Sequence, residues 1–236
     1  MRELPEFHGL VNFHKPPGVT SADCVSFIKR LTGAKKVGHG GTLDPFADGV
    51  LPIGINRGTR LLQEFISGDK TYAGYFRLGY KTDTLDVEGK LEIYSSSEKV
   101  FSLEEFEEKR QSLVGTYEQK TPHYSARKVQ GKKLYELARK NQLIEGIPGK
   151  RVTIYSLDLG PVERDRVNFS VTCSKGTYVR QLVQDFLEGS EFAGTLEKLT
   201  RTRVGPFEYE NAVNHHEFFK SLCVGEPFSG SWCMAL

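Results

Sequence analysis

The most constraining feature of this chain is the stretch from Gly38 to Gly54, which reads GHGGTLDPFADGVLPIG. It places one carboxylate, Asp44, between glycine-rich backbone and a proline, in a segment that we expect to be too irregular for a core element. Pro45 biases Asp44 away from the α region, so its side chain should leave an extended backbone. The glycines carry no Cβ and let a ligand approach the main chain closely. The stretch therefore predicts an acid displayed on a rigid loop.

An Asp-Pro pair flanked by glycines is also a common turn, because Asp, Pro and Gly each favour turns for local reasons. The second carboxylate of the stretch, Asp48, stands directly before Gly49 and fits that simple turn. Asp44 is therefore the candidate catalytic residue, and Asp48 is a candidate turn residue.

Two further side chains stand out. Tyr72 begins an alternating segment, and a strand tyrosine is most often a core or cross-strand aromatic. Arg180 ends the run CSKGTYVR and lies in a first helical turn, where a cation gains nothing from the helix dipole. That mismatch indicates an anionic partner for Arg180, although a surface position is the simpler alternative.

Together these segments resemble the TruB family of tRNA pseudouridine synthases. The matching pieces follow one another from Lys15 to Phe207: the K-P-x-G turn at Lys15, the Asp44 stretch, K-T-Y at Tyr72, P-H-Y-S-A-x-K ending at Lys128, CSKGTYVR, and the run from Leu199 to Arg203 before Gly205-Pro206-Phe207. The resemblance implies that Asp44 is the essential residue and that Arg180 pairs with it. It also implies that Tyr72 stacks on the target base and moves a proton.

The resemblance implies a reaction and a substrate as well. The T-loop uridine of tRNA, conventionally position 55, would be flipped out and isomerised to pseudouridine with no cofactor. Whether Asp44 attacks C1′, attacks C6 or acts as a base is left open by the sequence. The residues expected to contact the RNA are Lys15, His39, Gly41, Thr42, Lys128, Leu199 and Arg203.

Charge and composition are compatible with an RNA-modifying enzyme but do not by themselves indicate one. The formal net charge is only +2, so placement of the basic residues matters more than their number. The four cysteines form no ligand spacing, and we expect no metal site and two core thiols. No apolar run approaches membrane-spanning length, which predicts a cytoplasmic protein. The resemblance implies that the tRNA T arm is its partner, and we expect a monomer.

Strand and helix patterns mix without regular alternation, which predicts an α+β fold around a mixed, mainly antiparallel sheet flanked by helices, as the resemblance to pseudouridine synthases also implies. Three of the expected helices have identifiable caps. The first begins at a Ser21 cap and ends at Gly33, the second begins at a Ser102–Glu105 capping box and ends near Gly115, and the third follows a Thr177 cap. The expected domain spans 1–207. Residues 208–236 should form a short extension, too short for the RNA-binding PUA domain of many relatives.

Two other classes of function compete. One is an RNA chaperone of the same family that remodels tRNA without chemistry, which the joint presence of Asp44, Tyr72 and Arg180 argues against. The other is a nucleosidase or glycoside hydrolase, which also cleaves at C1′ but pairs two carboxylates. The second carboxylate would have to come from Asp48, Asp83 or Asp86, which stand in turn-rich contexts.

Overall fold

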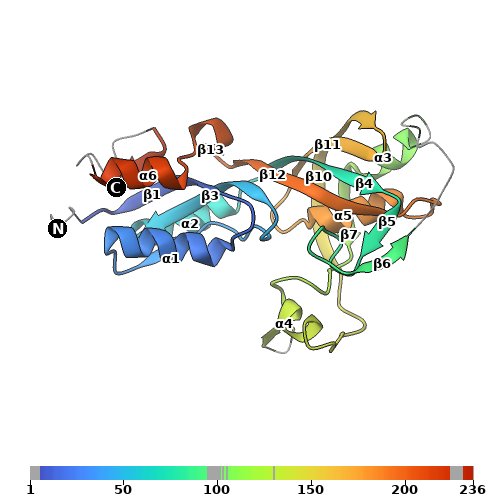
Figure 1. Ribbon diagram of the computed structural model, residues 1–236, viewed down its shortest axis with the longest axis horizontal. Coiled ribbons are helices and arrows are strands. Elements are labelled where there is room, and N and C mark those ends of the chain that lie inside the picture. The colour runs from blue at the N-terminus through green and yellow to red at the C-terminus, as the bar shows by residue number, and fades with distance from the viewer. Residues whose placement is uncertain are drawn as a thin grey trace. The chain divides into compact units, whose positions relative to one another are not determined.

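The computed structural model describes residues 6–94, 102, 104, 106–129, 131–223 and 231–235. The chain divides into two compact units, the first comprising 1–73 and 199–236 and the second comprising 74–198. It passes from one unit to the other within two strands, β4 (Lys70–Leu78) and β12 (Gly194–Val204). Helices and mixed strands occur in both units (Figure 1), so the α+β prediction is confirmed.

The first unit is built on a strand order of β14-β1-β3-β12, with β2 also paired to β3 and β13 to β12. Strands β1 and β3 are antiparallel, whereas β3 and β12 are parallel. The elements of this unit, besides β4 and β12, are β1 (Gly9–Lys15), α1 (Ser21–Thr32), β2 (Val37–His39), β3 (Asp48–Ile55), α2 (Gly58–Ile66), β13 (Phe207–Glu208), the 3-10 turn η1 (Tyr209–Asn211), α6 (His215–Cys223) and β14 (Cys233–Ala235).

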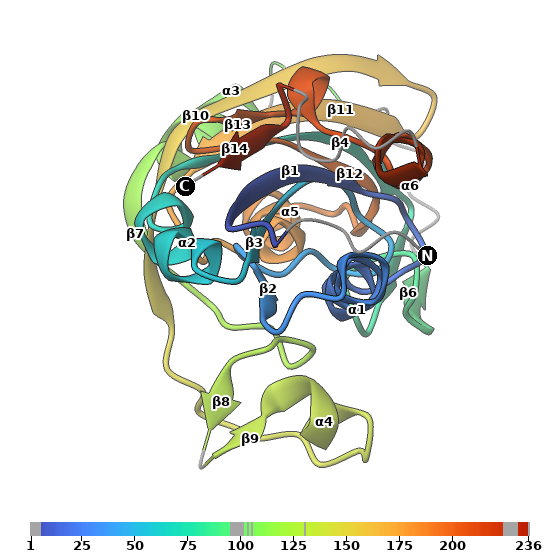
Figure 2. The ribbon, with the colours of Figure 1, turned by 90° about the vertical axis from the view of Figure 1, so that its left-hand side faces the viewer.

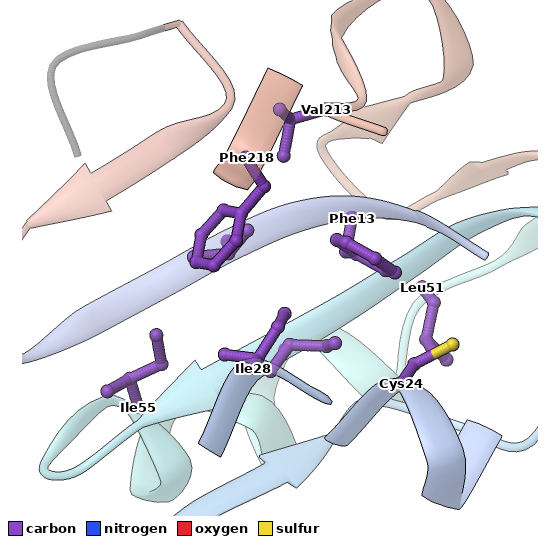
Figure 3. Packing of buried hydrophobic residues seen from close by; sticks show 9 residues of the cluster. Phe13, Cys24, Ile28, Leu51, Ile55, Val213 and Phe218 are labelled. Carbon is purple, nitrogen blue, oxygen red and sulfur yellow. The ribbon is translucent and has the colours of Figure 1, made fainter. Parts of the chain in front are cut away.

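The core of the first unit lies between β1, β3, α1 and α6 (Figure 3). Phe218 of α6 packs edge-on against Phe13 of β1, with ring centroids 6.4 Å apart. Strand β14 pairs with β1 as well. The described residues after Phe207 therefore contribute to the core of this unit. The apolar side chains of the core are Val11, Phe13, Cys24, Ile28, Leu51, Ile53, Ile55, Val213 and Phe218.

The second unit has the strand order β4-β11-β10-β7, with β10 antiparallel to both of its neighbours. A segment with β8, β9 and α4 projects away from the rest of this unit (Figure 2). The elements, besides β4 and β12, are β5 (Tyr80–Thr82), β6 (Leu91–Tyr94), α3 (Glu107–Leu113), β7 (Gly115–Gln119), β8 (Lys128–Val129), β9 (Lys132–Lys133), α4 (Leu134–Ala138), β10 (Lys150–Glu163), β11 (Arg166–Cys173) and α5 (Val179–Leu187).

The start of helix α1 corrects one sequence prediction. The N-cap is Thr20 rather than Ser21, and Thr20 forms a capping box with Asp23. The Ser21 hydroxyl is used elsewhere, because it bonds both the N–H and the C=O of Leu43. The predicted end of the helix is confirmed, since Gly33 adopts the left-handed conformation with φ 65°.

The other two helix starts also differ from the predictions. Helix α5 begins after Tyr178, whereas the Thr177 hydroxyl bonds the Ser174 carbonyl oxygen. Helix α3 begins after Phe106 without a side-chain cap, and Ser102 bonds Glu104. Glu105, the other half of the expected capping box, lies outside the described residues.

Candidate active site

The loop that carries Asp44 runs from Gly40 to Ala47, between β2 and β3. Its ends are held by backbone bonds, from Gly40 N–H to the Pro52 oxygen at 2.7 Å and from Ala47 N–H to the Asp44 oxygen at 3.2 Å. Leu43 is buried, and its two backbone groups bond Ser21 Oγ at 2.9 and 3.2 Å. The Asp44 side chain is half-buried on this fixed backbone, as the sequence predicted for a rigid loop.

The irregular part of the stretch ends sooner than predicted. Residues from Asp48 onward form β3, a strand whose apolar side chains are fully buried. Asp48 is therefore the first residue of a strand and not a turn residue. Its carboxylate accepts a hydrogen bond from Thr200 at 2.6 Å and lies 3.7 Å from the imidazole of His14.

Lys15 lies beneath the Asp44 loop and is fully buried. Its ammonium donates to the carbonyl oxygens of Pro16 at 3.0 Å, Pro45 at 3.0 Å and Ala47 at 2.6 Å. An ammonium has three donors, and here each one is directed at the main chain. The phosphate contact expected of Lys15 is therefore at odds with the structure, in which this residue holds the part of the loop that follows Asp44, at Pro45 and Ala47.

Arg201 of β12 holds the same loop from another direction and is 1% exposed. Its guanidinium donates to the carbonyl oxygens of Val50 at 2.8 Å, Gly41 at 3.0 Å and Thr42 at 3.5 Å. Gly41 has a φ of 111°, a conformation that favours glycine. Gly41 and Thr42 were predicted to contact the RNA; in the structure their carbonyls bind Arg201, and the Thr42 residue is exposed.

Arg201 was not singled out as a site residue from the sequence, and its replacement is expected to cost stability. Arg201→Met removes the donor from the buried carbonyl of Val50 and from the part-buried carbonyls of Gly41 and Thr42, and a buried unsatisfied group costs about 1–3 kcal/mol. We expect the free energy of unfolding to fall by about 2 kcal/mol or more in denaturant titration. Arg203→Met is the matched control on the same strand, because the Arg203 Nε makes one 3.3 Å bond to Thr71 Oγ1. A fall of equal size in both variants would contradict the loop-holding role.

His39 stands at the end of β2, next to the loop. Burial, and to a lesser extent the charge of Arg201, lowers the pKa of this imidazole from its usual value. Lowering favours the neutral ring at physiological pH. Its Nδ1 is buried without a hydrogen-bond partner among the described residues. A neutral, flat ring suits the predicted contact with a base.

The remaining predicted residues of the first unit are Tyr72 and Leu199, both buried, and Arg203, which is half-buried. Tyr72 is on β4, whose alternating face also buries Phe76 and Leu78, as predicted. Lys128 is exposed on the β8–β9 hairpin of the second unit, where it remains a candidate phosphate contact.

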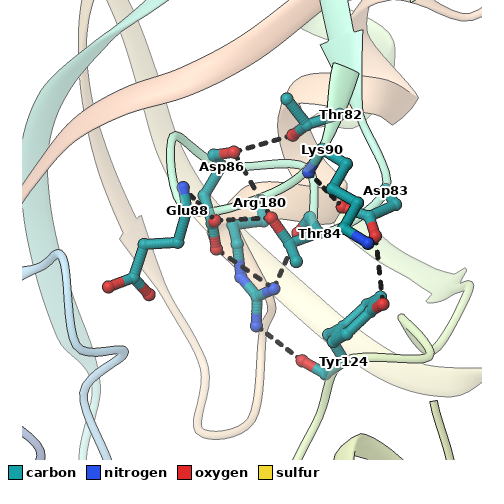
Figure 4. A network of polar contacts seen from close by, with 8 residues as sticks. All are labelled: Thr82, Asp83, Thr84, Asp86, Glu88, Lys90, Tyr124 and Arg180. Carbon is teal, nitrogen blue, oxygen red and sulfur yellow. Dashed lines mark hydrogen bonds and ion pairs between the residues drawn. The ribbon is translucent and has the colours of Figure 1, made fainter. Parts of the chain in front are cut away.

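Arg180 lies near the start of α5 in the second unit and is 5% exposed, which excludes the surface alternative. One Nη donates to the Thr84 carbonyl oxygen at 2.7 Å and the other donates to the Tyr124 carbonyl oxygen at 2.8 Å. An anionic partner is present in the same unit, because Asp86 Oδ2 lies 3.3 Å from the guanidinium (Figure 4).

Asp86 was not recognised from the sequence as the partner of Arg180. It was assigned to a turn-rich stretch, yet its residue is 3% exposed. Its Oδ1 accepts hydrogen bonds from Thr84 Oγ1 at 2.6 Å and from the Glu88 N–H at 3.0 Å. The available signal was the T-D-T-L-D pattern, since two threonines beside an aspartate can supply its hydrogen bonds.

The structure thus assembles two separate groups of charged residues, each within its own unit. The first holds the Asp44 loop with Lys15 and Arg201, and the second holds Arg180 with Asp86. An ion pair between Asp44 and Arg180 stays a prediction.

The described ranges bear on the predictions that the chain has no metal site and no membrane-spanning segment. Within them, no group of three or more His, Cys, Asp or Glu side chains is arranged to hold a metal ion. In the same part of the chain, none of the helices combines the length and apolar character needed to cross a bilayer.

Comparison with solved structures identifies the fold. A chain in the crystal structure of a Cbf5–Nop10–Gar1 complex superposes with a TM-score of 0.74 at 24% identity, covering 98% of this chain and 60% of that one. A chain of an H/ACA RNP bound to a substrate RNA gives a TM-score of 0.67 at 23% identity and covers 92% of this chain and 59% of that one. This chain therefore spans about 60% of the length of these structural relatives and shares their fold.

Sequence comparison is more specific. Residues 29–179 match the N-terminal domain model of the TruB family pseudouridylate synthases. The tRNA pseudouridine synthase B of Caldanaerobacter subterraneus subsp. tengcongensis is 44% identical over 220 residues, which are 93% of this chain and 76% of that protein. The protein of the same name from Geobacillus thermodenitrificans is 42% identical over 89% of this chain and 71% of its own length. The chain belongs to the TruB family of pseudouridylate synthases.

Proposed function

We propose that this chain isomerises a uridine of tRNA to pseudouridine, and that the target is the T-loop uridine at position 55. The observation that carries the proposal is 44% identity with a tRNA pseudouridine synthase B over 93% of the chain. The family model spans residues 29–179, which contain the Asp44 loop and Tyr72. Homologous chemistry is therefore expected at the same side chains.

The reaction rearranges bonds without changing composition. The N1–C1′ bond of uridine breaks, the base turns, a C5–C1′ bond forms, and a proton leaves C5 while N1 gains one. No electron or group is lost, so the reaction itself requires no cofactor. We assign Asp44 as the nucleophile or acid–base group, Tyr72 as the stacking residue and proton acceptor, and Arg180 as the ion-pair partner of Asp44.

The geometry of the Asp44 loop supports this assignment. A carboxylate that must meet one atom of a flipped nucleotide gains from a backbone that does not move. Lys15 and Arg201 fix carbonyl groups on both sides of Asp44, and both cations are buried. The loop is therefore preorganised before RNA binds.

A base in a stacked loop is out of reach of the carboxylate, so the nucleotide has to be extruded at a cost of roughly a few kcal/mol. Contacts with loop shape and backbone must offset that cost. We assign such contacts to Lys128 and Arg203, and contacts with the base to His39 and Leu199.

The competing hydrolase requires a second carboxylate, and the three candidates are engaged in structural contacts. Asp48 bonds Thr200, and Asp86 is ion-paired with Arg180. Asp83 accepts hydrogen bonds from the Tyr124 hydroxyl at 3.0 Å and from the Lys90 N–H at 2.7 Å. These contacts favour the isomerase over a glycoside hydrolase.

Tyr72→Phe tests the part of the proposal that concerns the phenol. The ring face survives, so tRNA affinity should stay within about twofold, whereas turnover should fall by about 10²-fold or more for want of the hydroxyl. Tyr72→Leu should weaken both. Single-turnover rates and equilibrium binding to unmodified tRNA measure the two effects separately. Equal turnover of Tyr72→Phe and the wild type would remove the proton-transfer role and leave stacking alone.

The proposed function itself is tested by incubating the protein with an unmodified tRNA transcript and mapping pseudouridine at nucleotide resolution. Conversion confined to the T-loop uridine is the expected result. Conversion elsewhere would overturn the position, and the absence of any conversion would overturn the activity. We also propose a cytoplasmic monomer, which sedimentation of the protein and fractionation of its host can check.

A further inference from the structure

Three basic residues meet at one point of the second unit. Lys150 begins β10, Lys175 and Gly176 form the turn between β11 and α5, and Arg127 precedes β8. A methyl group built on Gly176 would overlap the Lys150 ammonium, so this cation lies directly against the turn. Arg127 and Lys175 are the two charges that act on Lys150.

Within the described ranges, no ion pair links this group of cations to an acidic side chain. Among the residues that the structure describes, neither the Lys150 nor the Lys175 ammonium has a hydrogen-bond or ion-pair partner. Burial, and then the charges of Arg127 and Lys175, lowers the pKa of Lys150. The folded protein without a ligand therefore disfavours the charged form of Lys150.

The nearest acidic residue on the neighbouring strand faces the other way. In the β10–β7 register Lys150 is opposite Gln119, and Arg151 is opposite Glu118. Successive side chains of a strand point to opposite faces of the sheet. Glu118 therefore shares a face with Arg151, and Lys150 shares the opposite face with Gln119, which bonds both backbone groups of Tyr178 at the start of α5.

The backbone around the cations is firmly held. The Ser174 N–H and hydroxyl bond the two backbone groups of Thr153, which anchors the turn to β10. Arg127 Nη1 donates to the Pro148 oxygen and to Thr121 Oγ1, each at 2.6 Å. This leaves the Nε and Nη2 donors of Arg127, which make no hydrogen bond within the described part of the chain, for another acceptor.

We propose that Lys150, Lys175 and Arg127 form a binding site for a backbone phosphate of the substrate RNA. A phosphate has oxygen acceptors for several donors at once and removes the repulsion among the three cations. The turn at Gly176 leads directly into α5, which carries Arg180, so the phosphate belongs to a nucleotide bound at that helix. The inference rests on the proposed function, because it takes RNA as the ligand.

The test is tRNA binding by the full chain with Lys150→Gln, using Arg151→Gln as the matched control. The two residues are adjacent on β10, and they point to opposite faces. We expect Lys150→Gln to raise the Kd for an unmodified tRNA transcript about fivefold or more. The slope of log K against log salt should become shallower by about 0.7–0.9, the value for one phosphate contact. Arg151→Gln should leave both quantities near those of the wild type.

A second measurement separates binding from folding. Because the charged form of Lys150 is disfavoured in the folded state, Lys150→Gln should melt at the same temperature as the wild type or higher. A residue with a purely structural role would show the reverse. Lys175→Gln, on an exposed side chain, should change affinity and salt slope in the same direction and provides the test should Lys150→Gln fail to fold.

Unchanged affinity and slope in Lys150→Gln and Lys175→Gln, or equal losses in Arg151→Gln, would overturn the phosphate site. These outcomes differ from a failure of the proposed function, because binding is measured without reference to chemistry. A wild type that forms no pseudouridine would overturn the function whatever the Lys150 variant binds.

Discussion

Asp44→Asn is expected to abolish pseudouridine formation, with a rate at least about 10³-fold below that of the wild type. An amide has the shape of the carboxylate but is neither a base nor a nucleophile, and positioned groups of this kind contribute about 10²–10⁴-fold. Binding of tRNA should change little, because Lys15 and Arg201 bind backbone carbonyls of the loop, which the substitution keeps. Single-turnover kinetics with unmodified tRNA measures the rate.

Asp48→Asn is the control for that experiment, since Asp48 lies four positions further along the chain and also carries a carboxylate. Its contacts are with Thr200 and His14, so the expected loss is in stability and not in the chemical step. A variant Asp44→Asn that kept a tenth of wild-type turnover would refute the assignment of Asp44. A loss as large in Asp48→Asn would revive the two-carboxylate hydrolase.

Arg180→Lys is expected to lower turnover by about 10²-fold or more, although the charge is kept. The guanidinium serves the carbonyl oxygens of Thr84 and Tyr124 and the carboxylate of Asp86 from one rigid plane, which an ammonium does not reproduce. Arg180→Met goes further, because it leaves Asp86 as a buried charge without its cation, at a cost of about 3–5 kcal/mol in the free energy of unfolding.

The control is Arg77→Lys in the same unit, whose partner Asp165 lies 2.6 Å away in a pair that is more than 40% exposed. Exposed pairs contribute about 0–1 kcal/mol, so activity and stability should both stay near wild type. Asp86→Asn combined with Arg180→Met should recover part of the stability lost in Arg180→Met, but none of the activity. Wild-type turnover in Arg180→Lys would be incompatible with the proposed ion pair to Asp44.

Local sequence signals determined much of the fold. The left-handed Gly33 at the end of α1, the strand at Tyr72 and the irregular backbone of the Asp44 loop all follow from backbone preferences of a few neighbouring residues. Those preferences depend on residues only a few positions apart in the sequence, so they can be recognised without knowing which residues lie nearby in space. The same locality explains the misplaced caps, because Ser21 and Thr177 are good capping residues whose hydroxyls are used by Leu43 and Ser174.

The positions and partners of the charged residues were determined by the tertiary structure. Lys15 was expected at a phosphate, Arg201 was not singled out, and Asp86 was assigned to a turn-rich stretch. All three are buried, and their partners are distant in sequence: Ala47 for Lys15, Gly41 for Arg201, and Arg180 for Asp86. The cost of burying a charge depends on which acceptors or counter-charges the folded chain brings to it.

The sequence by itself therefore identified Asp44 as the candidate carboxylate on an irregular loop. It also showed the family resemblance that rests on the residues around Asp44. Only the folded chain decided which cations hold that loop and which remain to meet an anion. Lys15 and Arg201 have their charges directed at backbone carbonyls, whereas Lys150 and Lys175 have no partner among the described residues. In the sequence these four residues are alike as basic side chains. They differ because hydrogen-bond acceptors surround the first two in the folded protein.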